Sequence, residues 1–140
     1  MPRLASADAR AIARDYYDIA VSLGAHRFAE WERLSRSRRA ELESLEWTLL
    51  TYSSDMTTRA IDLAVDDLDA TLAAIKKAVR SLRRAVKHAD DVRDAMALAA
   101  RAVTLGAAIV TGNPAAIAAA VGASATRALQ ERRHLARPAG

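Results

Sequence analysis

The stretch IDLAVDDLDATLAAIKKAVRSLRRAV, residues 61–86, decides the fold of this chain. Its large apolar residues recur at spacings that alternate strictly between four and three, at Ile61, Val65, Leu68, Leu72, Ile75, Val79, Leu82 and Val86. This pattern is typical of an α-helix with a coiled-coil-like seam. Aspartates lie near its beginning and basic residues near its end, an order that the helix dipole favours. The sequence therefore predicts a long helix that packs through this seam and leaves its basic residues in solvent.

Two further helical stripes lie upstream of the seam. The first consists of Ile12, Tyr16, Ile19 and Leu23. The second, broader stripe runs from Phe28 to Tyr52. Gly24 lies between them, and it either ends the first helix or lies inside one continuous helix at a cost of about 1 kcal/mol. The pattern leaves both possibilities open.

Interruptions of the apolar register predict where helices end. The register slips just before the seam, so we expect a turn near residues 53–55, with Ser54 or Asp55 as the N-cap of the seam helix. Past the seam the heptad would place Arg93 in an apolar position, so a second break is expected near residues 88–90. Because no glycine or proline lies there, one unbroken helix remains an alternative.

The composition supports a helical chain. Alanine accounts for 34 of the 140 residues, 51% of the residues are hydrophobic, and only five are glycine and three proline, which is too few turn residues for an all-β protein. The absence of cysteine excludes a disulfide framework and thiolate metal ligands. We predict a single domain over residues 1–140, an elongated all-α bundle of four or five helices. The seam would lie at its centre, and a C-terminal antiparallel helical hairpin would complete it.

The stretch TGNP near the C-terminus is the strongest local signal. It puts glycine where one helix ends, asparagine where the next is capped and proline at that helix's first position. We therefore expect a hairpin over residues 90–134 that turns at Gly112, Asn113 and Pro114. Residues 135–140 would follow as a basic flexible tail.

Residues 102–126 contain no Asp, Glu, Lys, Arg or His, in a chain of which 27% is charged. In one interpretation the hairpin packs its small faces together and turns its large apolar residues onto the core. In the other its tip is exposed and contacts lipid or a protein partner, because an uncharged hairpin leaves no obvious solvated face. Each arm has about half the length needed to cross a hydrocarbon core, so at most a shallow insertion is expected. The candidate contact residues are Leu105, Ile109, Val110, Ile117 and Val121.

Long heptad helices followed by the uncharged hairpin GAAIVTGNPAAIAAAVGA resemble, over residues 95–129, the apolar hairpin region of α-helical pore-forming toxins. In those proteins the hairpin is sheltered in the soluble form and released at a membrane. The resemblance implies a non-enzymatic protein with a membrane-active hairpin, and it carries over no site residue. Arg132, Arg133 and Arg137 of this chain would then contact anionic lipid head groups. The alternative is a soluble interaction or assembly module, an adaptor or homo-oligomer, that uses the hairpin as a protein interface.

Charge is divided unevenly along the chain. Residues 1–94 carry as many basic as acidic side chains, so the net charge of +4 comes from the C-terminal third. Without a concentrated basic face we do not expect nucleic-acid binding. Trp31 and Trp47 lie near several arginines in the sequence and are expected in the core. No secretory signal is apparent, so we expect a cytoplasmic protein as synthesised, with membrane association or export by a signal-independent route left open.

Few residues suggest chemistry. His26 with Glu30, and His88 with Asp91, have spacings at which two side chains share a helix face. Two ligands do not make a metal site, and no nucleophile with a histidine and an acid at motif spacing is present. We therefore expect no catalytic, cofactor-binding or metal-binding residue, no cofactor and no small-molecule substrate.

Overall fold

The computed structural model describes residues 4–58, 61 and 67–123. The helices in order are α1 (Ser6–Ala29), the short 3-10 helix η1 (Trp31–Arg33), α2 (Arg36–Thr58), α3 (Leu68–Lys87) and α4 (Val92–Thr111). Residues 114–123 form a further helix after α4. The described residues contain no strand, so the prediction of an all-α bundle is confirmed.

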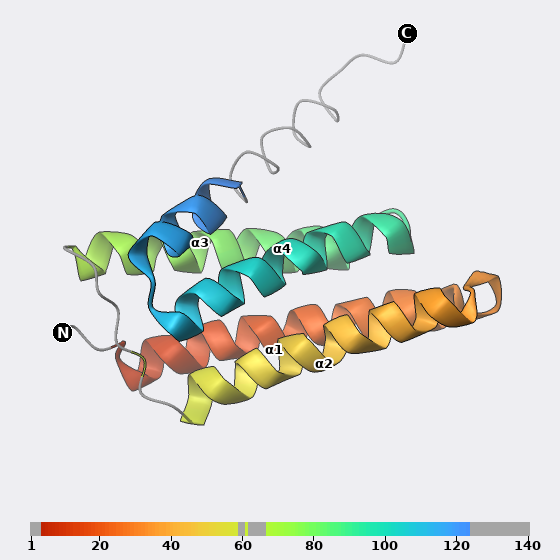
Figure 1. The fold of residues 1–140 in the computed structure, drawn as a ribbon, viewed down its shortest axis with the longest axis horizontal. Helices are drawn as coiled ribbons and strands as arrows, with labels where there is room; N and C mark the ends of the chain where they lie inside the picture. The colour runs from red at the N-terminus through yellow and green to blue at the C-terminus, as the bar shows by residue number, and fades with distance from the viewer. Residues whose placement is uncertain (1–3, 59–60, 62–66, 124–140) are drawn as a thin grey trace, which may run out of the picture.

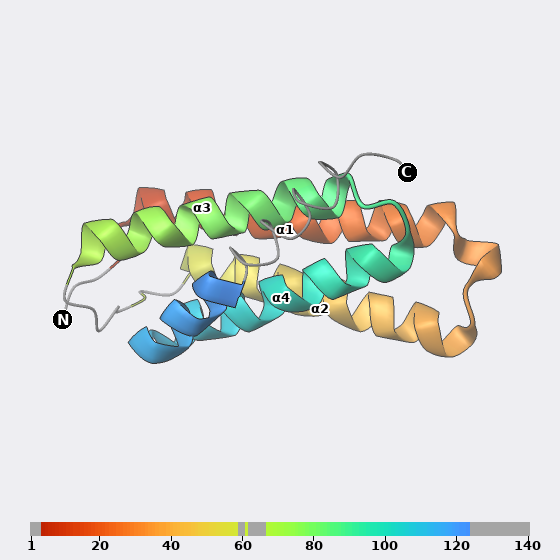
Figure 2. The ribbon, with the colours of Figure 1, turned by 90° about the horizontal axis from the view of Figure 1, so that it is seen from above.

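The helices form two layers. α1 and α2 lie antiparallel in one layer, and α3 and α4 lie antiparallel in the other (Figures 1 and 2). α1 packs on α3, α2 packs on α4, and α1 and α4 also contact each other across the bundle. Of the four long helices, α4 buries the most residues. The seam of α3 faces the core, where Ile75, Val79, Leu82 and Val86 are buried, and α1 and α4 are the helices that contact all the others.

One continuous core lies between the two layers. All four residues of the first predicted stripe, on α1, are buried. The seam of α3 contributes mainly its second half, from Ile75 onward. The largest fully buried side chains are Ile12, Tyr16, Ile19, Leu23, Leu42, Leu49, Met56, Ile75, Leu98, Leu105 and Ile109. Apolar burial of this kind is the main stabilising contribution in a helical bundle without disulfides.

α1 runs without a break through Gly24, which decides between the two possibilities for the N-terminal segment. Gly24 lies where α1 meets α2, and a Cβ atom there would be 2.9 Å from Oε1 of Glu46. One turn later, Nε of Arg27 donates to Oε2 of Glu46 at 2.7 Å. The chain reverses only after Ala29, through η1. Gly24 therefore lies within the helix, opposite the side chain of Glu46, and does not end it.

The predicted turn at residues 53–55 is wrong, because α2 continues to Thr58. Two contacts hold this part of α2 against the bundle. The hydroxyl of Ser53 donates to the carbonyl of Ala13 on α1 at 2.7 Å, and Met56 is buried in the core. The apolar register therefore slips a few residues before α2 ends at Thr58.

The seam helix begins later than predicted. α3 starts at Leu68, where the carboxylate of Asp67 accepts a hydrogen bond from the N–H of Ala70 at 3.0 Å. Ile61, the first seam residue, is buried before the helix begins, and its carbonyl accepts a bond from the N–H of Leu4 at 2.8 Å. Ile61 therefore fits the heptad spacing and is buried, although it lies in the segment before α3 and not in a helix.

The predicted break between α3 and α4 is confirmed. α3 ends at Lys87, and the carboxylate of Asp91 caps α4 by accepting from the N–H of Asp94 at 2.8 Å. The first N–H of α4, that of Val92, donates to Oε2 of Glu30 at 2.9 Å. The turn after α1 is thereby joined to the start of α4.

Ion pairs across the layers use the acids of α1. Lys76 of α3 binds Asp8, and Nη1 of Arg83 lies 2.9 Å from Asp15 and 3.7 Å from Asp18. These three aspartates are the only acids between Ser6 and Ala29. Every acid of α1 therefore lies on the side that faces α3, and its opposite side carries none.

Candidate functional site

The predicted turn of the C-terminal hairpin is confirmed. Gly112 ends α4 in the left-handed region, at φ 68°, which glycine adopts at little cost. Its N–H donates to the carbonyl of Ile109 at 3.1 Å. The side chain of Asn113 accepts from the N–H of Ala116 at 3.1 Å and so caps the next helix, in which Pro114 takes the first position. These local bonds fix the reversal of the chain.

The five candidate contact residues do not form an exposed tip. Leu105, Ile109 and Ile117 are buried in the core, and Val110 and Val121 pack against it with part of their surface exposed. Ile117 keeps only 3% of its surface exposed. The large apolar residues of the hairpin thus face the bundle, as in the first interpretation of the sequence. Any contact of the three buried residues with lipid or a partner requires the hairpin to move.

α4 packs tightly against the other layer at Gly106. A Cβ atom there would be 2.6 Å from Cδ2 of Tyr52 and 3.1 Å from Cε1 of Tyr16. The hydroxyl of Tyr16 donates to the carbonyl of Ala102 at 2.6 Å, and the two tyrosine rings meet edge to face. Burial, reinforced by Tyr52, raises the pKa of Tyr16 far above its ordinary value. The hydroxyl therefore stays neutral and keeps its proton for the bond to α4.

The helix that follows the turn, residues 114–123, is called the second arm below, and its two sides differ. One side contacts the core through Ile117 and Ala120. Nη1 of Arg101 donates to the carbonyl of Ala123 at 3.2 Å, so the arm returns alongside α4 as an antiparallel hairpin requires. The other side is exposed and uncharged, and consists of Pro114, Ala115, Ala118, Ala119, Gly122 and Ala123.

α4 is, among the described helices, the one long and apolar enough to cross a membrane by length and composition, with a mean hydropathy of 1.4 over the most apolar part. The core helix of a soluble bundle meets the same criteria, and 44% of that part is buried inside the bundle. Length and hydropathy of α4 therefore do not by themselves distinguish a membrane span from a core helix.

The remaining predicted site residues lie outside the described part of the chain. These are Arg132, Arg133 and Arg137, together with the hairpin beyond residue 123 and the tail at 135–140. Their expected contact with lipid head groups stays a prediction.

The histidine pairs noted in the sequence do not come together as ligands. Nε2 of His26 lies 2.8 Å from the carbonyl oxygen of Val86, whereas Glu30 accepts from the N–H of Val92. Within the described ranges, no three His, Cys, Asp or Glu side chains gather where they could hold a metal ion.

The expectation that Trp31 and Trp47 lie in the core is wrong. Trp47 is 72% exposed and Trp31 37%. The guanidinium carbon of Arg39 lies 4.0 Å from the centroid of the Trp31 ring, a cation–π contact. Glu43 and Glu46 of α2 both bind Arg27. The hydrogen bond to Glu46, together with the charges of Glu46 and Glu43, raises the pKa of Arg27, which stays charged.

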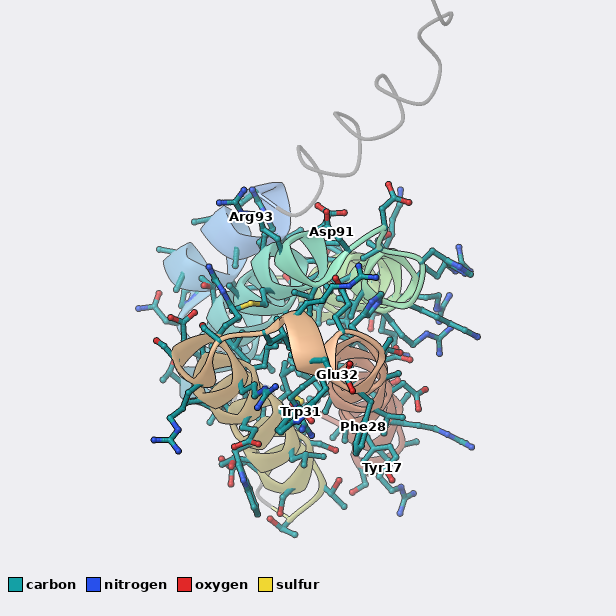
Figure 3. The ribbon with its side chains drawn as sticks, turned by 90° about the vertical axis from the view of Figure 1, so that its right-hand side faces the viewer. Tyr17, Phe28, Trp31, Glu32, Asp91 and Arg93 are labelled. Carbon is teal, nitrogen blue, oxygen red and sulfur yellow. The ribbon has the colours of Figure 1, made fainter. Side chains whose placement is uncertain are left out.

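The large apolar side chains that are exposed among the described residues lie on α1, α2 and the turn between them. Figure 3 shows Tyr17, Phe28 and Trp31 on the side of the bundle away from Asp91 and Arg93. A groove of about 550 Å³ lies at this turn and is lined by residues 27–33. The large apolar side chains with the highest exposure are Tyr17, Val21, Phe28, Trp31 and Trp47.

The sequence of α1 contains a second set of helically spaced positions, which corresponds to this surface. Positions 10, 14, 17, 21, 24 and 28 also alternate between spacings of four and three, and they lie next to the core positions on the same helix. Apolarity alone does not show which of two neighbouring stripes faces inward. The other helices decide it: α2, α3 and α4 all contact α1 and bury the core stripe, and Tyr17, Val21 and Phe28 stay exposed.

Comparisons of the chain with protein-family models, with characterised proteins and with solved structures gave no match. Any assignment of function therefore rests on the geometry of the bundle.

Proposed function

We propose that this protein is a non-enzymatic helical bundle that associates with membranes, and that the second arm of its hairpin is the segment that enters the lipid. The observation that carries the proposal is the asymmetry of this arm. Its outer side is exposed and uncharged, while its inner side holds the bundle through few residues. A surface helix of a soluble protein normally presents charged residues to water.

The energetics favour movement of the second arm over movement of α4. Ile117 is the one large side chain that the described part of the arm buries fully, and burying such a side chain contributes about 1.5–3 kcal/mol. α4 buries Leu98, Leu105 and Ile109 together with several small residues, so its removal would dismantle the core. Lipid can replace the few contacts of the arm. It cannot replace the core that α4 completes.

The depth of insertion follows from the length of the arm. The uncharged residues 114–126, which Arg127 follows in the sequence, would span at most about 20 Å as a helix at 1.5 Å per residue, less than a hydrocarbon core of about 30 Å. Ile117, Val121 and the neighbouring Val110 would supply the apolar contact that alanine lacks. The arm would therefore lie in one leaflet and not cross the bilayer, and Arg132, Arg133 and Arg137 would stay at anionic head groups.

A fluorescent label on the outer side of the arm tests this directly, because the chain contains no cysteine to compete for it. Ala118→Cys places an environment-sensitive fluorophore at an exposed site of the arm, and Ala73→Cys places it at an exposed site of α3. With vesicles of phosphatidylcholine and phosphatidylglycerol, we expect the label at position 118 to brighten and to be quenched by nitroxide lipids. The label at position 73 should stay in water.

Introducing an aspartate on the exposed side of the second arm tests whether insertion is needed for dye release from vesicles. Ala118→Asp lies on the exposed side and should leave the melting temperature unchanged, yet desolvation of the carboxylate should prevent insertion. Ala73→Asp makes the same change on α3 and should have no effect on dye release. Ile117→Asp is unsuitable because Ile117 is buried. Insertion is ruled out if the label at position 118 stays in water on vesicles that carry bound protein.

The assembly module remains the alternative function, and the same preparation tests it. Light scattering without lipid should show monomers if the hairpin is directed at membranes. Stable oligomers that Ala118→Asp dissociates would instead make the second arm a protein interface.

A further inference from the structure

We infer that the outer side of the α1–α2 layer is a docking surface for an anionic phospholipid bilayer. The surface, called the aromatic-arginine face, consists of Arg10, Arg14, Tyr17, Val21 and Phe28 of α1 and of Arg36 and Trp47 of α2. It is separate from the hairpin that the proposed function concerns. The inference rests on the proposed function only in naming a membrane as the partner.

Packing between the two helices places these side chains on one face. Gly24 meets Glu46, and Nη1 of Arg27 lies 3.7 Å from Glu43, so this side of α1 adjoins the side of α2 that carries Glu43. Residues three, four and seven apart on a helix share a side. Tyr17, Val21 and Phe28 stand at these distances from Gly24, and Trp47 follows Glu43 by four residues.

The middle of the face exposes four large apolar side chains to solvent. Phe28 is 74% exposed, Trp47 72%, Val21 54% and Tyr17 53%. Clustered exposed aromatic and aliphatic side chains mark interaction surfaces. Trp and Tyr in particular are enriched at membrane interfaces, where the ring contacts acyl chains and the polar group reaches water or head groups.

The charges of the face call for an anionic partner. All acids of α1 point toward α3, and the basic residues Arg10 and Arg14 remain on the outer side. On α2, Arg36 precedes Glu43 by seven residues and so shares its side, and Glu43 itself is paired with Arg27. Arg27 binds both Glu43 and Glu46, so this group keeps one negative charge, against the three positive charges of Arg10, Arg14 and Arg36. The face therefore presents a net positive charge.

The position of the arginines favours a bilayer over other anionic or apolar partners. α1 and α2 are antiparallel, so Arg10 and Arg14 lie at one end of the face and Arg36 at the other, with the aromatic side chains between them. An apolar centre can enter the head-group region while both ends reach phosphates. A second copy of the chain would bring like charges together, and a nucleic-acid strand would need cations along its whole path.

Flotation with vesicles of phosphatidylcholine, with and without phosphatidylglycerol, tests the inference. Each arginine near an anionic surface strengthens binding about five-fold, so Arg10→Ser with Arg14→Ser should weaken binding to the anionic vesicles by about 25-fold. The matched control is Arg80→Ser with Arg84→Ser, which removes two exposed arginines from α3 in the other layer. The control should bind as wild type does.

The fluorescence of Trp47 reports on the apolar part of the face. Trp31→Phe leaves Trp47 as the sole tryptophan, and its emission should shift to the blue on anionic vesicles. Trp47→Ser should reduce flotation without lowering the melting temperature, since the side chain is exposed.

The outcomes separate this inference from the proposed function. Loss of flotation in the α1 double variant, together with a label at position 118 that stays in water, would leave the docking face standing and remove insertion by the arm. Equal flotation of wild type and the α1 double variant would overturn the docking face, as would equal losses in the α1 and α3 double variants. Trp47-dependent binding of single-stranded DNA without binding to anionic vesicles would assign the face to nucleic acid and overturn it too.

Discussion

Replacing Gly106 by alanine is expected to destabilise the bundle, whereas the same replacement at Gly122 is not. Both glycines lie in helices of the hairpin. At Gly106 the added methyl group would be 2.6 Å from Cδ2 of Tyr52, and at Gly122 nothing lies within 4 Å of it. The two variants therefore differ in packing and not in chemistry.

The expected difference follows from two opposing effects. Alanine gains about 1 kcal/mol over glycine in a helix interior, at either position. Insertion of a methyl group into a packed contact costs about 1–3 kcal/mol, and only Gly106→Ala pays this. The Tyr52 ring cannot swing away freely, since the Tyr16 ring packs against its edge and Tyr16 is fixed to Ala102. Helix propensity cancels between the variants, so Gly122→Ala should be more stable by about 1–3 kcal/mol.

Urea denaturation followed by circular dichroism measures the free energy of unfolding of wild type and both variants. Gly122→Ala should unfold at or above the wild-type midpoint, and Gly106→Ala below that of Gly122→Ala. A Gly106→Ala variant as stable as Gly122→Ala would show that α4 does not approach α1 and α2 as closely as described. The packing of the hairpin against the tyrosines would then have to be abandoned.

Three further substitutions test other parts of the bundle. Tyr16→Phe removes the hydroxyl that donates to Ala102 and should cost about 1 kcal/mol in urea denaturation at neutral pH. Because burial raises the pKa of Tyr16 above its ordinary 10.0, wild type should lose stability as pH rises above that value, and melts of Tyr16→Phe should show a smaller alkaline loss. Ile75→Asp puts an unpaired charge in the core and should abolish the helical circular dichroism, so a variant that keeps its melting temperature would refute the assigned core. Asn113→Ala removes the bond from Ala116 and should cost about 1 kcal/mol by calorimetry, and an unchanged melting temperature would show that this cap contributes nothing.

Periodicity and caps predicted the helical class, the break before α4 and the Gly112 turn, because each depends on local chemistry. The start of α3 could not be predicted in the same way. Ile61 continues the spacing of the seam and is buried, but it belongs to a connection whose backbone bonds to Leu4, a residue far away in the sequence. A spacing rule records which side chains face the core and not whether the chain between them is helical.

The exposed aromatic side chains show a second limit. Tyr16 and Tyr17 are neighbours of the same type, yet Tyr16 is fully buried and Tyr17 is 53% exposed. Their difference arises from the positions of α2, α3 and α4, which all contact α1 and cover the stripe of Tyr16 but not that of Tyr17. Glu46, next to Trp47 in the sequence, likewise finds its partner Arg27 only in the folded chain. Tertiary packing thus determines both the exposure and the net charge of this surface.

The hydrogen bond from Val92 to Glu30 fixes the start of α4 to the α1–α2 turn, at the end opposite Gly112. The 20 residues of α4 place the Gly112 turn about 30 Å from this bond. Between the two lie the bond from Tyr16 to Ala102 and the contact of Gly106 with Tyr52. α4 is therefore held to the α1–α2 layer at its first residue and again in its second half, and the second arm follows where these contacts end.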